Sequence, residues 1–334
     1  MITKRQKFSL IFFLTSSFFL ASGYSLIFKI SEKDSWISMI IGTLIGLLII
    51  LTFNIFSFNK KRKYILNKDL KIFYKVIMII FFSFILFINI LIVRIFTTSF
   101  LLTKTPGIII TIPFILLAYK NAKHGINSIA KIAEILLPIS IIIILLTIIA
   151  VLKDGSINSF FPLLTVSKNK ILTSSIYYAI FTSVPNLLLF DTKIDLKTHI
   201  KSYLFSSIII SLIGVFIIYT LGPYLIKIFR FPEYMVLKQL KVFNFIEKIE
   251  NLIGLIWIFN LFISASLSLY NIDKVSNSNI LNLLIIGIII YIIEFISNNY
   301  EYAMVLYKNL PIILFIISLI FSLIIFKLKH KKSS

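Results

Sequence analysis

Long apolar runs separated by short polar segments divide the whole chain. Each run is close to the roughly 17–25 residues that a helix needs to cross a hydrocarbon layer of about 30 Å. The runs lie at residues 8–28, 36–56, 72–93, 107–119, 126–152, 171–190, 203–226, 252–270, 280–296 and 311–326. The pattern predicts an all-α integral membrane protein with about ten transmembrane helices. No stretch indicates a soluble domain, so residues 1–334 are predicted to form one transmembrane domain.

Composition supports the same class. The chain is 59% hydrophobic and its mean hydropathy is +1.01, which is more apolar surface than a soluble core of this length can hide. The absence of cysteine excludes disulfides and thiolate metal sites. The net charge of +21 would indicate nucleic acid in a soluble protein. Here it follows from basic cytoplasmic loops and from the composition of an AT-rich genome, so the predicted partner is the lipid bilayer and no nucleic acid.

The basic residues also predict the orientation in the membrane. Lys and Arg concentrate in alternate loops, and the side of the membrane that holds more of them is cytoplasmic. That side holds Lys4, Arg5, Lys7, Lys60, Lys61, Arg62, Lys63, Lys68, Lys71, Lys120, Lys123, Lys131, Lys193, Lys197, Lys201, Lys274, Lys327, Lys329, Lys331 and Lys332. With an even number of spans, both termini are expected in the cytoplasm.

The first run has an alternative interpretation as a secretory signal peptide. Basic residues, an apolar stretch and the small residues 21–23 loosely resemble such a signal and its cleavage site. The apolar run continues to residue 28 and is long enough to span, so we favour a retained helix. The lack of cysteine excludes a lipoprotein.

One segment between the seventh and eighth spans, residues 233–250, has helical periodicity. Val236, Leu240 and Phe243 recur on one side, and Lys238 and Lys241 lie on the other. We expect an amphipathic helix on the membrane or over the bundle, and the same helix could cover an outward-facing vestibule.

Residue patterns typical of catalysis are absent from the sequence. His124, His199 and His330 fall in predicted loops or the tail among lysines and are interpreted as solvated. No HExxH, phosphate-binding loop, GxSxG or dinucleotide fingerprint occurs. We therefore expect no enzyme, no cofactor and no metal site. Arg94, at the end of the third span, and Glu294, near the outer end of the ninth, are interpreted as interfacial residues.

Polar residues interrupt two of the spans. They are Thr15, Ser16 and Ser17 in the first span and Thr182, Ser183, Pro185 and Asn186 in the sixth. Pro185 cannot donate the backbone hydrogen bond of a continuous helix, so a break there frees backbone groups inside the membrane.

The two interruptions correspond if the chain consists of two five-helix halves. In transporters built from inverted repeats, interruptions in corresponding helices mark the substrate site. We therefore predict a small-molecule site at broken helices one and six, with Tyr178, Trp257 and Asn260 beside it. The alternative is an ordinary proline kink combined with Ser and Thr packing between helices.

Several segments together resemble the spore germination permease family, the B subunits of nutrient germinant receptors. No single motif is specific, but their order and spacing extend over most of the chain. The matching segments contain Asp34, Trp36, Ile37 and Ser38; Arg94 and Phe96; Thr105 and Pro106; Gly125, Ile129, Ala130, Lys131 and Glu134; Phe160, Phe161 and Pro162; and Phe231, Pro232, Glu247, Glu250, Ile256 and Trp257.

The resemblance implies a fold like that of amino acid–polyamine–organocation transporters, with inverted repeats at about 8–152 and 171–328. It also implies a receptor subunit in the spore inner membrane that senses an amino acid, sugar or nucleoside. Its expected partners are a larger membrane A subunit and a lipoprotein C subunit. Two other hypotheses stay open: a transporter of amino acids or related solutes, and a scaffold that binds no solute.

Overall fold

The computed structural model describes residues 2–19, 23–57, 72–152, 155–190, 192, 194–239, 250–298 and 300–330. These residues form helices and connecting turns, with no strand among them. The α-helices are α1 (Lys4–Ser17), α2 (Tyr24–Ser31), α3 (Ser35–Ser57), α4 (Ile72–Phe96), α5 (Gly107–Lys123), α6 (Ile126–Val151), α7 (Lys168–Ser183), α8 (Leu196–Ile228), α9 (Pro232–Gln239), α10 (Glu250–Ser276), α11 (Asn279–Asn298) and α12 (Tyr300–His330). The first predicted apolar run overlaps α1 and α2, the sixth overlaps α7 and the 3₁₀ helix after it, and each of the others overlaps one α-helix.

Seven helical segments of the described residues are long and apolar enough to cross a membrane. They begin at Tyr24, Ile72, Ile126, Lys168, Leu196, Gly254 and Asn279. The first of them, Tyr24–Thr52, joins α2 to α3 across the short helix η2 (Glu32–Asp34). Helices α1 and α5, of 14 and 17 residues, and the apolar part of α12, Asn309–Leu323, are shorter. The chain is therefore a multi-pass membrane protein.

Helices α1 and α2 follow the same neighbour, α8, from one end to the other. The Ser202 hydroxyl donates to the Phe8 carbonyl over 2.6 Å, and the Tyr24 hydroxyl donates to the Ile210 carbonyl over 2.6 Å. Just past α2, Glu32 pairs with Lys227 at 3.3 Å. The chain runs in the same direction along α8 and along α1 followed by α2. Helices α1 and α2 are therefore two parts of one broken helix.

The sixth run contains the second break. The α-helix α7 ends at Ser183, and the chain continues as the tighter 3₁₀ helix η6 (Val184–Leu189), which has Pro185 in its first turn. Proline is tolerated there because the first turn of a helix leaves its N–H groups unbonded.

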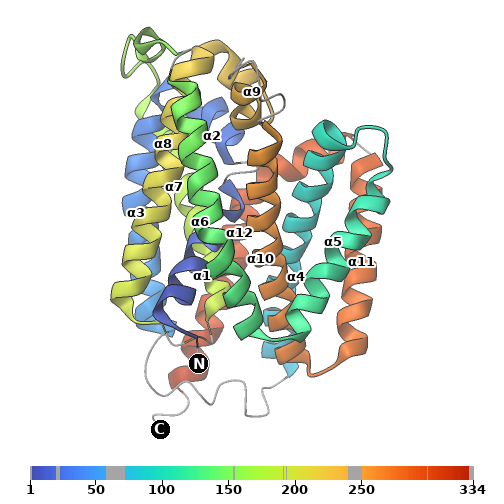
Figure 1. Ribbon diagram of the computed structural model, residues 1–334. Coiled ribbons are helices and arrows are strands. Elements are labelled where there is room, and N and C mark those ends of the chain that lie inside the picture. The colour runs from blue at the N-terminus through green and yellow to red at the C-terminus, as the bar shows by residue number, and fades with distance from the viewer. Residues whose placement is uncertain are drawn as a thin grey trace.

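The helices gather in two groups (Figure 1). Helices α3, α7 and α8 pack together around α1 and α2, whereas α4, α5 and α11 form the second group. Helix α10 contacts both groups, since it packs on α1 and also on α4 and α5. The junction between the groups therefore contains the first break and one face of α10.

One interpretation from the sequence is wrong. His199 lies in the first turn of α8 and is only 2% exposed, because it faces neighbouring helices rather than solvent. The sequence did not indicate the partner of Arg94: its Nη2 lies 2.8 Å from Glu294 Oε2, and this ion pair joins α4 to α11.

The amphipathic segment is partly described. Helix α9 covers its beginning, with Val236 buried and Lys238 exposed as predicted. Residues 240–249 lie outside the described residues.

Candidate functional site

The two interruptions predicted from the sequence meet in the structure. Asn186, in η6, donates from Nδ2 to the Thr15 hydroxyl oxygen over 3.1 Å and to the Thr182 carbonyl over 3.0 Å. A carbonyl oxygen can only accept, so the second contact fixes which end of the amide faces Thr182. The Asn186 Oδ1 atom is buried and has no hydrogen-bond partner among the described residues. The first and sixth predicted spans are thus joined at their polar residues.

Ser16 connects the first break to α10. Its hydroxyl makes a short hydrogen bond to Asn260 Oδ1 and also lies 2.8 Å from the Phe12 carbonyl. Asn260 donates its own Nδ2 to the Ile256 carbonyl over 2.6 Å. The Phe13 carbonyl lies 3.3 Å from the Ser16 hydroxyl, so one serine proton faces three acceptors.

The polar contacts continue into α4 through a residue that the sequence argument missed. Asn89 donates to the Ser264 hydroxyl over 3.0 Å, and Ser264 is one helical turn from Asn260 on α10. A lone asparagine inside the apolar run 72–93 was the available signal. We call the six residues that connect η6, α1, α10 and α4 the polar belt: Asn186, Thr15, Ser16, Asn260, Ser264 and Asn89. All of them are 0–3% exposed.

Ser17 and Ser183, also predicted as site residues, bond within their own helices. The Ser17 hydroxyl donates to the Leu14 carbonyl over 2.9 Å, and that of Ser183 donates to the Ala179 carbonyl over 2.6 Å. Both side chains are buried. The structure does not bring either one into the polar belt.

Tyr178 and Thr182 join α7 to α8. The Tyr178 hydroxyl donates to the Ser207 carbonyl over 3.0 Å, and the Thr182 and Tyr203 hydroxyls lie 3.0 Å apart. The Tyr178 ring also packs against Phe19, at the first break, with ring centroids 4.7 Å apart. Movement at the first break would therefore reach α7 through Phe19.

The 3₁₀ helix leaves a carbonyl group for a partner outside it. Asn271 of α10 donates to the Leu188 carbonyl over 2.8 Å, and its side chain is 2% exposed. Asn271 lies just past the eighth apolar run, and nothing in its sequence neighbours indicates this contact. Asn186 holds the beginning of η6 to the Thr182 carbonyl, and Asn271 holds its end, so η6 is held at both ends.

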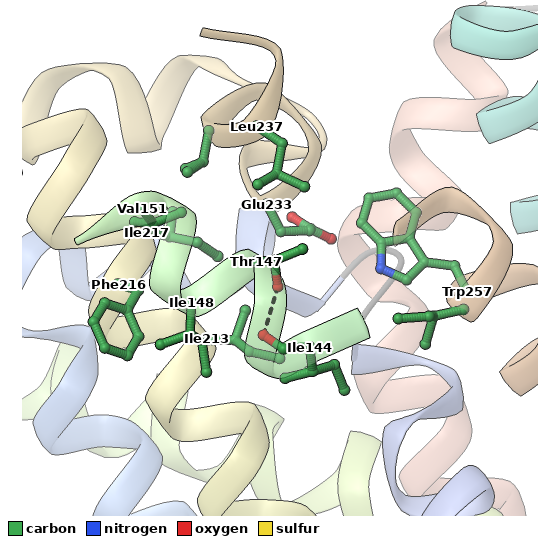
Figure 2. A pocket seen from close by; sticks show the side chains of 12 residues that line it. Ile144, Thr147, Ile148, Val151, Ile213, Phe216, Ile217, Glu233, Leu237 and Trp257 are labelled. Atoms are coloured by element: carbon green, nitrogen blue, oxygen red, sulfur yellow. Dashed lines mark hydrogen bonds between the residues drawn. The ribbon is translucent and has the colours of Figure 1, made fainter. Parts of the chain in front are cut away.

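Trp257 lies in a separate pocket under α9. Its ring packs against Phe96, with centroids 4.6 Å apart. Figure 2 shows Trp257 beside the pocket, with Glu233 entering from α9 and Thr147 from α6. The pocket has a volume of about 40 Å³, which is room for a few water molecules.

Two amide oxygens of the polar belt accept no hydrogen bond from the described residues. The Oδ1 atoms of Asn186 and Asn89 have no partner among the described residues, and Asn260 Oδ1 shares one serine proton with two backbone carbonyls. Burying an acceptor without a partner costs about 1–3 kcal/mol. The belt is therefore suited to a guest that brings N–H or O–H groups.

These features define a multi-pass, all-helical membrane protein with polar side chains buried between its helices. Residues 2–303 match the family described as spore germination protein, and the chain belongs to that family. It is also similar to a protein named spore germination protein XB from Bacillus anthracis. The two are 24% identical over 249 residues, which cover 70% of this chain and 70% of the relative. The resemblance seen in the sequence motifs is confirmed.

Proposed function

We propose that the chain is the membrane subunit of a spore nutrient germinant receptor and that it binds a small nutrient at the polar belt. The observation that carries the proposal is the hydrogen bond between Asn186 and Thr15, which joins the two breaks. Membership of the spore germination protein family supports the process in which the subunit acts.

The proposed topology has ten spans in two inverted five-helix repeats, at about 8–152 and 171–328. Two kinds of packing support it: α7 packs on α3, and α1 with α2 packs on α8. If α1 and α2 together are span one, then span six packs on span two and span one packs on span seven. An inverted repeat exchanges these two contacts, because it relates span one to span six and span two to span seven. Figure 1 shows the start of α1 and the end of α12 at the same end of the bundle, as an even number of spans requires.

The contacts of α1 also support a retained first span. Ser9, Thr15, Ser16 and Ser17 are at most 2% exposed, and Ser16 bonds to α10. A cleaved signal would remove the Thr15 partner of Asn186 and the Ser16 partner of Asn260 from the bundle. We therefore place both termini in the cytoplasm, on the side that carries more lysine and arginine.

The unpartnered amide oxygens of the polar belt favour a nutrient with an amino group over one that only accepts hydrogen bonds. An ammonium group offers three hydrogen-bond donors, and the amide oxygens of Asn186, Asn260 and Asn89 are hydrogen-bond acceptors. None of the six belt residues is charged. Among amino acids, sugars and nucleosides, we propose an amino acid.

Binding becomes a signal because the polar belt joins helices of both groups. A nutrient that takes over contacts of Ser16 and Asn260 would change how α1 sits against α10. It can shift the bundle only by as much as its affinities for the two arrangements differ. In this proposal, the shift reaches a larger membrane A subunit and a lipoprotein C subunit, which should copurify with the tagged chain from spore inner membranes.

A spore germination assay on a deletion strain tests the proposal. Loss of the response to one nutrient class, restored by the wild-type gene, supports a receptor subunit. Complementation with Ser16→Ala, Asn260→Leu or Pro185→Ala should change the nutrient dose response while the protein still accumulates. Normal germination with every nutrient, together with lost solute uptake by vegetative cells, would instead favour a transporter.

A further inference from the structure

Glu233 is a buried carboxyl group in an apolar pocket. Its side chain is 4% exposed, and neither Oε1 nor Oε2 has a hydrogen-bond partner among the described residues. Acidic residues are common in the first turn of a helix, where the helix dipole favours them, and Glu233 holds that position in α9. Such residues are usually solvated. A glutamate without a partner in a closed pocket is costly to keep, so a structural role alone does not account for it.

The walls of the pocket come from four helices. Ile144, Ile148 and Ile217 give it aliphatic surface, and Trp257 gives it an aromatic ring. Besides Glu233, the polar side chain in the wall is Thr147. The Thr147 hydroxyl donates to the Ile144 carbonyl over 2.7 Å, so its oxygen is left to accept from a guest. Figure 2 shows Glu233 and Thr147 facing the same space, with Trp257 alongside.

We propose that the pocket under α9 binds a small primary ammonium compound, with Glu233 as its counterion and Trp257 as its aromatic wall. The three donors of an ammonium group match two carboxylate oxygens and one hydroxyl oxygen. An organic cation also gains from the face of an indole ring. The carbon chain of the compound would lie along the isoleucines.

A metal ion fits the same pocket poorly. Calcium takes six to eight oxygen ligands and magnesium a full octahedron, whereas the described wall offers one carboxylate and one hydroxyl. No group of three or more His, Cys, Asp or Glu side chains occurs among the described residues. The apolar wall therefore selects a cation that carries its own hydrocarbon.

The pocket is distinct from the polar belt but has a physical connection to it. Glu233 interacts electrostatically with Tyr24, at the start of α2. The Tyr24 ring packs on Phe19 at the first break, with centroids 4.7 Å apart. An ammonium compound under α9 would thus change the surroundings of the first break without touching the belt.

Trp257 fluorescence tests the proposal directly. The chain has two tryptophans, so Trp36→Phe leaves Trp257 as the reporter. The purified full chain in lipid nanodiscs is titrated with methylammonium to butylammonium, with butan-1-ol as the neutral control. We expect a saturable change whose affinity rises about fourfold per methylene until the pocket is filled. Glu233→Gln, nearly equal in volume, should weaken butylammonium binding at least about tenfold.

Control variants separate the alternatives. Asp273→Asn, which removes a carboxylate elsewhere, should leave the affinity unchanged. Equal affinity in the Glu233→Gln variant, equal affinity for butan-1-ol, or no saturable response from folded protein would each overturn the proposal. A tenfold tighter affinity after Lys241→Ala and Lys248→Ala together would also overturn it, since the chain's own lysine would then be the occupant.

Discussion

Asn186 and Thr15, 171 positions apart in the chain, share an N–H···O hydrogen bond of 3.1 Å. The bond joins a 3₁₀ segment to the end of a broken α-helix, and both side chains are buried. Asn186 also bonds to the Thr182 carbonyl of its own half, whereas the bond to Thr15 crosses to the other half. The contact is therefore where the two halves of the proposed inverted repeat can influence each other.

A double-mutant cycle on this pair should show energetic coupling. Thr15→Val and Asn186→Leu each remove one partner with little change in shape. Hydrogen bonds between membrane helices contribute about 0.6 kcal/mol on average, so we expect a coupling energy of about that size. Thermal unfolding in detergent measures it. Strict additivity of the two single changes would show that the bond contributes nothing to stability.

The ion pair of Arg94 and Glu294 should matter far more than the pair of Lys123 and Asp273. The Arg94 side chain is 10% exposed and that of Glu294 28%, whereas Lys123 and Asp273 are each 32% exposed. Removing one partner of a buried pair costs about 3–5 kcal/mol, and an exposed pair contributes about 1 kcal/mol or less. We expect Glu294→Leu to lower the unfolding temperature strongly and Asp273→Leu to lower it little. The opposite order would contradict the assigned pairing.

Close packing of α3 on α7 should make Gly42 intolerant of a side chain. A Cβ at Gly42 would lie 2.7 Å from the Ser175 carbonyl oxygen and 2.8 Å from Tyr178 Cβ. Overpacking of this kind costs about 1–3 kcal/mol. Gly287 is the matched control, because a Cβ there has nothing within 4 Å. Gly42→Ala should lower the unfolding temperature by several degrees and Gly287→Ala should not; equal effects would refute the packing.

The apo protein should become less stable as pH rises from about 5 to 8, because of Glu233. Burial raises the pKa of this carboxyl well above its usual range, and α9 lies outside the membrane spans. The folded state therefore holds a proton that the unfolded state has already released. Stability is full below the ordinary glutamate pKa and falls by up to about 1.4 kcal/mol per pH unit above it.

Glu233→Gln removes this dependence, and the variant should be more stable than the wild type at pH 7.5. Tyr24 interacts electrostatically with Glu233, but the ordinary pKa of a tyrosine lies above the pH range tested. Titration of Tyr24 therefore does not contribute to the dependence. Thermal unfolding curves for both proteins across the pH range supply the comparison. Parallel curves would show that another group causes the dependence.

The sequence predicted the helices well because membrane spans are defined by the length of an apolar run. It also indicated that Thr15 and Asn186 belong together, since a polar residue inside hydrocarbon must find a partner. Asn89 follows the same rule, but it interrupts no helix and was not among the predicted site residues.

Other features depend on tertiary packing and leave no local pattern. Arg94 and Glu294 lie 200 positions apart, and either could have reached the interface alone. The pocket of Glu233 and Trp257 forms only when α9 folds back over α6 and α10. His199 was misjudged because lysines flank it in sequence, whereas its own side chain turns into the bundle.

The dose response of spores to the nutrient tests the central claim most directly. Asn186→Leu is compared with Asn121→Leu, which makes the same change at a buried asparagine that bonds to Ser266 of α10 over 3.3 Å, away from the breaks. With equal amounts of both variants in the spore membrane, Asn186→Leu should raise the half-maximal nutrient concentration about tenfold. Asn121→Leu should leave it unchanged. Identical dose responses of the two variants would contradict a nutrient site at the polar belt.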